Sequence, residues 1–420
     1  MGMFILFSIG WFLIIGIILL LCLLYSVGVG GCLFMCVNVF NELFVFDSIS
    51  FYLIVLVLLL GLYSQVMFFG LLTVKVRFFL VVSMVFAVIC FCINHSVLFW
   101  CVYELSMFPL LYLIFSESPY SERFLASWYF SGYLLVTSLP LILILLYLSY
   151  VNGSFFFSEW CCVDGNVPFS IFYVLSFVFF TKVPLVPFHT WLPVVHAEAI
   201  SIVSIFLSGY IMKLGLLGVY RSTFFVFDLS FVSYLFVCCL ISVGFLVIAC
   251  GELDGKRWLA FLSLSHIVVP FFGFFVSDWV SVGYSFFYCL GHGLSAGLVF
   301  GLLWCFYDVS NTRNWILLKS GIGGVVSVII VVLSVLSLCS FPITIQFFCE
   351  VYLIGQCFGV LFYLLFWVCY LFFGGLVPLI LCGHLLIRSE YYESVSVSYY
   401  CYYYYLCFLI FWCFFGIIFL

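Results

Sequence analysis

Apolar segments of about 20 residues follow one another along most of the chain, and short polar stretches separate them. A helix of roughly 20 apolar residues is long enough to cross the hydrocarbon core of a bilayer. Of the 420 residues, 68% are hydrophobic and only 6% are charged, and the mean hydropathy is +1.43. This composition excludes an ordinary soluble domain and gives no support to nucleic-acid binding. The sequence therefore predicts an all-α, polytopic membrane helix bundle.

Segment length predicts about thirteen membrane spans. The expected spans are 3–25, 48–69, 77–94, 96–115, 124–150, 168–196, 201–221, 229–250, 258–276, 280–306, 319–356, 359–387 and 398–419. They form a single transmembrane domain, residues 1–420. Within it we expect N-terminal helices at 1–76, a first repeat at 77–221, a second repeat at 229–387 and a C-terminal helix at 398–420.

Two of these spans are predicted to be broken helices. Pro184, Pro187 and Pro193 follow Lys182 closely, and proline removes a backbone donor and disfavours helix at the residue before it. The span 319–356 is too long for one straight crossing and contains Pro342. Irregular backbone at membrane depth is tolerated where it is buried in protein or lines a polar cavity. One broken helix in each half is typical of inverted repeats around an ion or substrate site.

Basic residues alternate between the loops. When each loop is numbered by the span it follows, one basic residue, Arg221, falls in an odd loop. Eight fall in even loops: Lys75, Arg77, Arg123, Lys256, Arg257, Arg313, Lys319 and Arg388. Lysine and arginine collect on the cytoplasm-like side of membranes, so the even loops are predicted to lie inside.

Four charged side chains lie deep inside predicted spans. At 1.5 Å per residue, Lys213 lies roughly 18 Å from the start of its span, and Lys182 and Glu104 lie about 21 Å and 12 Å into theirs. Glu350 follows Pro342 by two helical turns. A charge at the bilayer centre costs roughly 2.5–3.5 kcal/mol, so such residues usually face a polar interior and serve transport. The alternative for Lys182 is a kinked packing helix with a snorkelling lysine.

Three histidines are further candidates for moving protons, because imidazole both accepts and donates near neutral pH. His266 and His292 would carry protons laterally, and Gly291 and Gly293 leave room for water around His292. His189 follows the first break. Each could instead be a hydrogen-bonded packing residue. Asp254, Lys256 and Arg257 are expected in a loop, where they could be a plain solvated cluster.

The 21 cysteines contain no C-x-x-C pair, which argues against zinc, iron–sulfur or thioredoxin-type chemistry. Together, 57 Phe, 28 Tyr and 21 Cys against 10 Pro suggest thymine-rich codons, which are common in organelle genomes. We interpret this bias as a sign of mitochondrial coding, with cysteine serving as a small apolar filler.

Several motifs together resemble the antiporter-like membrane subunits of respiratory complex I and of the multisubunit sodium/proton antiporters that share their fold. They are YELSMFPLLYLI, TKVPLVPFHTWLPVVHAEA, IMKLGLLGVYR, LDGKRWLAFLSLSHIVV and HGLSAGLVF, and the likeness covers about residues 42–360. The resemblance implies that Glu104 and Lys182 form the acid and base of an input half-channel and that Lys213 is the central relay. It also implies that His292 and His266 form the lateral link, and that Glu350 is the output-side carrier.

The buried charged residue of the second broken helix helps to distinguish the subunits of this family in mitochondria. Chains 2 and 5 usually carry lysine there, whereas this chain carries Glu350 and ends soon after its last predicted span, without the long lateral helix of chain 5. Three departures from the family pattern stand out. One N-terminal span fewer is expected than the usual fourteen, Ile200 replaces a common proline, and Ile343 replaces a common glycine.

The resemblance predicts a proton-translocating subunit of NADH:ubiquinone reductase in the mitochondrial inner membrane. No cofactor would be bound by this chain, since NADH, FMN, iron–sulfur clusters and ubiquinone would be held by other subunits. The expected partners are other membrane-arm subunits, including chains 2 and 5, and phospholipids such as cardiolipin. The alternative is a stand-alone subunit of a multisubunit cation/proton antiporter. A purely structural helix bundle is disfavoured by the buried lysines.

Overall fold

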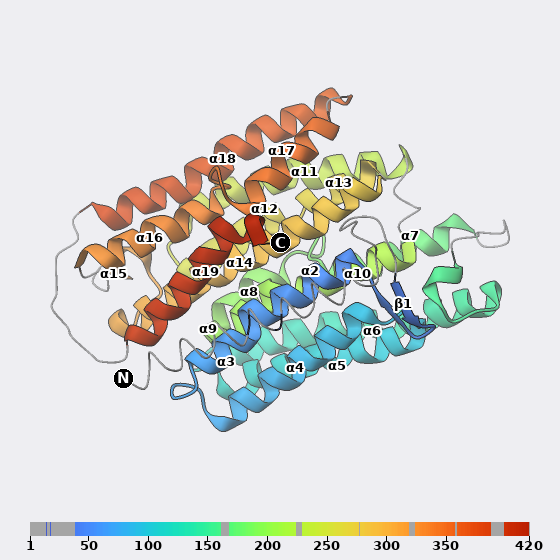
Figure 1. Ribbon diagram of the computed structural model, residues 1–420, viewed down its shortest axis with the longest axis horizontal. Coiled ribbons are helices and arrows are strands. Elements are labelled where there is room, and N and C mark those ends of the chain that lie inside the picture. Colours follow the sequence, from blue (N-terminus) through green and yellow to red (C-terminus); the bar gives the residue numbers. More distant parts are fainter. Residues whose placement is uncertain are drawn as a thin grey trace.

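A computed structural model describes residues 14, 17, 38–160, 168–223, 229–276, 278–318, 324–357, 359–387 and 399–419. Over these ranges the chain forms a bundle of long helices that run side by side, with one short β-hairpin (Figure 1). Helices α4, α5 and α6 lie along the lower edge of the view, α16, α17 and α18 lie along the upper edge, and helices of both halves run between them. The predicted all-α, polytopic class is confirmed.

The first half begins with the antiparallel hairpin of β1 (Asn38–Asn41) and β2 (Phe44–Phe46). Its helices are α2 (Ser48–Val57), η1 (Leu58–Leu62), α3 (Tyr63–Met67), α4 (Val74–Cys92), α5 (Ser96–Glu117), α6 (Arg123–Asn152), η2 (Phe157–Glu159), α7 (Phe169–Lys182), α8 (Trp191–Glu198), α9 (Ser201–Phe206), η3 (Leu207–Ile211) and α10 (Met212–Thr223). The segments η1 and η3 are π-helical turns inside otherwise α-helical spans.

The second half continues the same construction. Its helices are α11 (Leu229–Gly251), α12 (Gly255–His266), α13 (Val269–Val276), α14 (Trp279–Ser310), α15 (Trp315–Leu318), α16 (Gly324–Leu338), α17 (Ile345–Gln356), α18 (Leu361–Leu386) and α19 (Tyr399–Phe419).

Within the described ranges, ten helical segments are long and apolar enough to cross a membrane. Together with the two broken pairs α7/α8 and α16/α17, they coincide with twelve of the thirteen predicted spans. The remaining predicted span, 3–25, falls outside the described residues, apart from positions 14 and 17, so the count of thirteen is not confirmed.

Four spans form the inside of the bundle. They are Ser48–Met67, Ser201–Thr223, Gly255–Val276 and Val280–Ser310, and 78–100% of an apolar 18-residue stretch of each is buried within the chain. In the other six long spans only 33–50% of such a stretch is buried. Because lipid tails are as apolar as a protein core, hydropathy alone does not distinguish the two layers. Lys213, His266 and His292 lie on these inner spans, whereas Glu104 lies on an outer one.

Contacts between loops divide the chain into two faces. The Lys75 ammonium lies 3.0 Å from the Glu117 carboxylate, and Asp254 forms a β-bridge with Asn314. These contacts, with those of Lys256 described below, bring the even loops together on one side, here called the even-loop face. Arg221 pairs with Asp47 at 3.0 Å on the opposite side, among the odd loops. This grouping is the one that the charge pattern predicts.

Both predicted breaks are present. Helix α7 ends at Lys182 and α8 begins at Trp191, while α16 ends at Leu338 and α17 begins at Ile345. The first break is shorter than predicted because Pro193 lies in the first turn of α8, where a missing N–H costs no helical hydrogen bond. The division into inverted repeats remains a prediction.

The two departures from the family pattern have different backbone geometries. Ile200 has φ −61° and ψ 146°, close to the φ that proline's ring would impose, so isoleucine occupies a proline-like conformation without strain. Ile343 has φ 90°, a conformation that β-branched residues rarely adopt and that glycine adopts freely. The second break therefore stores backbone strain at Ile343.

Candidate functional site

The first break places Lys182 next to Glu104, as predicted. The Lys182 ammonium lies 3.6 Å from the Glu104 carboxylate, and the two side chains are 4% and 8% exposed. Lys182 also lies 5.6 Å from the centre of the Tyr103 ring. Two opposite charges buried this deeply compensate each other, whereas either one alone would be costly. The pair joins α5 to the last residue of α7.

Side chains of the protein satisfy the backbone of this break. The Tyr234 hydroxyl donates to the Val186 carbonyl at 2.6 Å, and the Trp191 indole N–H donates to the Thr181 carbonyl at 2.9 Å. Carbonyls released by a broken helix need partners inside a bilayer, and these side chains supply two of them. The open end of α7 is thereby fixed close to Lys182.

Lys213 is fully buried in the centre of the bundle. Its ammonium donates to the Ser208 carbonyl at 2.6 Å, inside the π-helical turn η3. A π turn adds one residue to the helix and leaves backbone carbonyls available. In the described part of the chain no carboxylate lies within 4.0 Å of Lys213, in contrast to Lys182. Nothing in the sequence predicts this π turn.

The helices that carry the two lysines touch directly. A Cβ atom at Gly215 would lie 2.7 Å from the Val183 side chain and 3.2 Å from the Lys182 Cβ, so glycine is required there for α10 to approach α7. The Glu104–Lys182 pair and Lys213 are therefore carried by helices in direct contact. In a water-poor interior a change in the charge of that pair acts strongly on a nearby lysine.

In the second half, Glu350 lies at the centre of a hydrogen-bonded group. Its Oε1 accepts from the Ser340 hydroxyl at 2.8 Å and from the Tyr370 hydroxyl at 3.3 Å. Glu350 is 1% exposed. Ser340 belongs to the break between α16 and α17, so the break itself supplies a hydrogen-bond donor to the buried carboxyl of Glu350.

The two central histidines lie together, as predicted for a lateral link. The rings of His266 and His292 are 5.2 Å apart, and both are almost fully buried. His266 Nδ1 contacts the hydroxyls of Tyr288 at 3.0 Å and of Tyr370. The Gln346 amide nitrogen lies 3.4 Å from His292 Nδ1. Lys213 is within electrostatic reach of both rings.

Sequence reasoning missed Tyr288, Tyr370, Gln346 and Ser340. Tyrosine and serine are common throughout this chain, so neither residue type is a signal by itself. Gln346, four residues before Glu350 on α17, could have been found as a polar residue on the same face of that helix.

His189 lies in the first break, as predicted, and is half-buried. Its ring contacts Phe245, with ring centres 4.7 Å apart, and its Nδ1 is enclosed without a hydrogen-bond partner among the described residues. The structure does not bring it into the Glu104–Lys182 pair, and its part in proton transfer remains a prediction.

The interpretation of residues 253–257 as a solvated cluster is wrong for Lys256. Lys256 is 3% exposed, and its ammonium donates to the Ala199 carbonyl at 2.7 Å. Arg313 donates to the Ala197 carbonyl and pairs with Glu198 at 3.3 Å. The last carbonyls of α8 are thus bound by cations, which the negative end of a helix dipole favours. The local sequence at 253–257 is typical of a polar loop, but the packing of α8 against α12 buries the Lys256 side chain.

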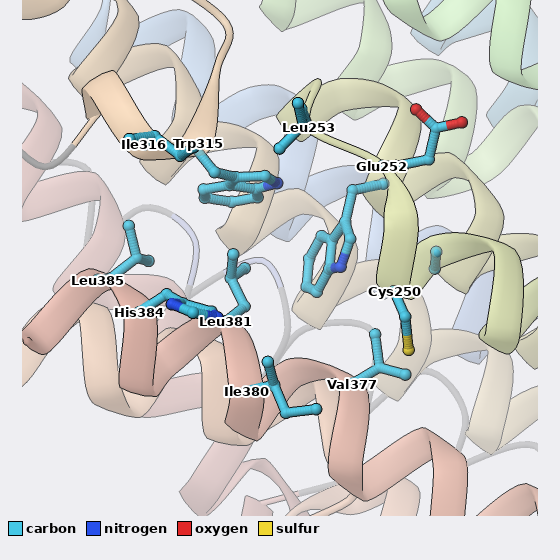
Figure 2. Close-up of a pocket in the computed structure, with 12 residues that line it drawn as sticks. Cys250, Glu252, Leu253, Trp315, Ile316, Val377, Ile380, Leu381, His384 and Leu385 are labelled. Carbon is cyan, nitrogen blue, oxygen red and sulfur yellow. The ribbon is translucent and has the colours of Figure 1, made fainter.

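A cavity of about 220 Å³ also opens near the even-loop face, between α11, α15 and α18. Figure 2 shows Trp315, Val377 and Leu381 around it, with Glu252 and His384 among its lining residues. None of the predicted site residues lines this cavity, so it lies apart from the row of buried charges.

The fold and the site define a class of protein. A helical membrane bundle with two interrupted helices and a central row of buried acid, lysine and histidine is typical of ion- and proton-translocating membrane proteins. The chain belongs to the family described as NADH:quinone oxidoreductase/Mrp antiporter, transmembrane, whose model matches residues 94–376.

Known relatives agree with this assignment. NADH-ubiquinone oxidoreductase chain 4 of Rhipicephalus sanguineus is 31% identical over 248 residues, which is 58% of this chain and 56% of the relative. The corresponding protein of Locusta migratoria is 31% identical over 225 residues, 53% of this chain and 50% of the relative. The chain thus spans about half the length of these curated relatives. Both are chain 4 proteins, in agreement with Glu350, which distinguishes this chain from the lysine usual in chains 2 and 5.

Solved structures share the fold. A chain of respiratory complex I from Thermus thermophilus with bound NADH superposes with a TM-score of 0.77 at 16% identity, covering 99% of this chain and 95% of that one. A chain of the Mrp complex from Dietzia sp. DQ12-45-1b superposes with a TM-score of 0.74 at 17% identity, covering 94% of this chain and 76% of that one.

Proposed function

We propose that this chain is a proton-translocating subunit of NADH:ubiquinone oxidoreductase, of the chain 4 type. The observation that carries the proposal is Lys213, a fully buried lysine held by one backbone carbonyl on a helix that contacts α7, the helix of Lys182. Such a lysine can lose and regain its proton without breaking an ion pair. A purely structural lysine would be expected to have a carboxylate partner.

The mechanism follows from the order of the groups. Protonation of Glu104 would free Lys182 from its partner and raise the positive potential at Lys213. Lys213 would then release its proton toward His292 and His266, and Glu350 would receive it in the second half. No electron passes through these side chains, so the driving energy must arrive by electrostatic and conformational coupling from neighbouring subunits.

The proposal also specifies the partners of the chain and the membrane in which it lies. Its partners would be other membrane-arm subunits, including the antiporter-like chains 2 and 5, and phospholipids such as cardiolipin. NADH, FMN, iron–sulfur clusters and ubiquinone would be bound by other subunits. The membrane would be the mitochondrial inner membrane, and the chain would be encoded in the mitochondrial genome, as the thymine-rich codon bias suggests.

A second candidate function is a subunit of a multisubunit cation/proton antiporter, which the fold shared with the Mrp complex favours. Purification in mild detergent separates the two candidates. Migration of the chain with flavin and iron–sulfur proteins supports the oxidoreductase. An assembly without them that exchanges sodium for protons supports the antiporter.

Substitution of Lys213 tests the pump itself. Lys213→Met keeps the volume and removes the titration, and Lys213→Arg keeps a charge that a protein cannot neutralise. We expect both variants to assemble and both to lose quinone-linked proton translocation in membrane vesicles, with arginine no better than methionine. Assembly is checked on native gels.

A structural ion pair predicts the reverse order, with Lys213→Arg largely functional and Lys213→Met unstable because a buried partner loses its counter-charge. Normal pumping in the assembled Lys213→Met variant would remove Lys213 from the pathway and, with it, the proposed function.

A further inference from the structure

The histidine pair and Glu350 are separated by two tyrosines that have no assigned part in transport. Tyr288 comes from α14 and Tyr370 from α18, and each is 1% exposed. Their hydroxyls lie 3.1 Å apart, and both contact the same atom, His266 Nδ1. The Tyr370 hydroxyl also donates to Glu350 at 3.3 Å. A continuous line of hydrogen bonds therefore runs from His266 through Tyr370 to Glu350.

We propose that Tyr370, assisted by Tyr288, is the catalytic bridge that passes protons between His266 and Glu350. The inference rests on the proposed function and specifies its last lateral step. A phenol suits this position because its O–H both donates and accepts, so one proton can leave as another arrives. A water molecule is not needed between the two groups.

The direction of the hydrogen bonds defines the step. Since Tyr370 donates its proton to Glu350, its oxygen is free to accept from His266 Nδ1–H. An incoming proton binds His266 Nε2, which is buried and has no hydrogen-bond partner in the described structure. The Nδ1–H bond breaks, the Tyr370 oxygen takes that proton, and the original Tyr370 O–H proton bonds to Glu350.

The balance of this step is complete. Glu350 changes from carboxylate to carboxylic acid, Tyr370 ends as a neutral phenol, and His266 ends as the neutral tautomer with its proton on Nε2. The step needs no oxidant or reductant. Before the next transfer His266 must return to its first tautomer, gaining one proton at Nδ1 and losing one from Nε2, so that its net proton count is unchanged.

The other hydrogen bonds of His266 and Glu350 indicate that the Tyr370 hydroxyl is not needed to hold these residues in place. Removing the Tyr370 hydroxyl would leave His266 Nδ1 bonded to Tyr288 and Glu350 bonded to Ser340. No buried group would lose its last partner, so assembly should survive. Only the hydrogen-bonded connection through Tyr370 would be cut, and Tyr288 would remain beside His266.

The test uses Tyr370→Phe in the whole complex, reconstituted in vesicles. We expect quinone-linked proton translocation to fall at least about tenfold, toward the roughly 10²–10⁴-fold contribution of a positioned acid–base group. Oxidation of NADH by a water-soluble acceptor, which bypasses the membrane step, should stay unchanged. The double variant Tyr288→Phe with Tyr370→Phe should be slower than Tyr370→Phe alone, because no phenol remains.

Tyr363→Phe is the matched control. Tyr363 lies on the same helix, is fully buried and donates its hydroxyl proton to the Val232 carbonyl at 3.4 Å. It should pump normally. Normal pumping in Tyr370→Phe would overturn the bridge, and so would failure of Tyr370→Phe to assemble while Tyr363→Phe assembles, since the hydroxyl would then be structural. Normal pumping in Lys213→Met would instead overturn the proposed function, so the two failures are distinguishable.

Discussion

Two buried lysines in this protein have the same chemistry but different kinds of partner. Lys182 faces the carboxylate of Glu104, whereas Lys213 faces one backbone carbonyl. Both lysines were predicted from their depth in apolar spans, because a buried charge is rare enough to stand out. The partner of Lys182 could also be predicted, since Glu104 is itself a buried charge. The carbonyl partner of Lys213 could not, because a π turn leaves no mark in the sequence.

Ile343 gives a prediction at this scale. Its φ of 90° is a strained conformation that costs about 1–3 kcal/mol in a non-glycine residue. Ile343→Gly removes that strain. It also gives the unfolded chain more conformational freedom, which destabilises the folded state by roughly 0.5–1 kcal/mol and offsets part of the gain. Because Ile343 is 55% exposed, little packing is lost. We expect a longer half-life of the assembled complex on heating, measured by native gels.

The control for Ile343→Gly is Val351→Gly. Val351 is similarly exposed, at 51%, but lies within α17, where glycine costs about 0.8–1.0 kcal/mol relative to alanine. The two variants should change the half-life in opposite directions. A shorter half-life for Ile343→Gly would mean that its side chain contributes more to the break than its backbone strain removes.

Whole elements meet at points that local sequence does not reveal. The helix spans and both breaks were predicted because their causes, apolar length and proline, are local. The clamp at the end of α8 was not predicted, since it joins residues far apart in the chain, Lys256 and Arg313. Tyr370 escaped prediction for the same reason: one of 28 tyrosines becomes distinctive only beside His266 and Glu350.

The clamp predicts a stability effect at the scale of elements. Arg313 contacts the end of α8 through the Ala197 carbonyl and Glu198, and lies 3.5 Å from Asp254 on the α12 side. Arg313→Gln should destabilise the complex by about 1–3 kcal/mol, the range for losing hydrogen bonds to a charged group, with the lower end favoured because the side chain is 28% exposed. Thermal inactivation of the complex measures this loss.

Arg257→Gln is the matched control for the clamp. Arg257 is an exposed neighbour of Lys256 on α12, and surface substitutions of this kind usually change stability by less than about 0.5 kcal/mol. If Arg313→Gln and Arg257→Gln destabilised the complex equally, the contacts of Arg313 with the end of α8 would not be the cause. The loss of stability would then be due to the change in net charge near the even-loop face.

At the scale of the whole molecule, the positions of the lysines define the orientation of the bundle in the membrane. Lys182, Lys213 and Lys256 are buried, and Lys75 is exposed on the even-loop face. The fifth lysine, Lys319, belongs to an even loop by sequence. The odd loops therefore contain no lysine. Since basic residues collect on the inner side of a membrane, the even-loop face should be the inner one, which in mitochondria is the matrix.

A membrane-impermeant amine reagent tests this orientation. Applied to vesicles with the matrix face outward, it should label Lys75, which has a side-chain exposure of 48%, and leave Lys182 and Lys213 unmodified when labelled peptides are mapped by mass spectrometry. Applied from the opposite side, it should label none of the five lysines. Tyr150→Lys adds a reporter for that side, because Tyr150 is 86% exposed near the end of α6 that leads into an odd loop. Labelling of Lys75 and of the new lysine from the same side would contradict the two-face arrangement. If each lysine is instead labelled from the side opposite to the one expected, the fold stands but its orientation in the membrane is reversed. The direction in which the buried charged residues move protons would then be reversed as well.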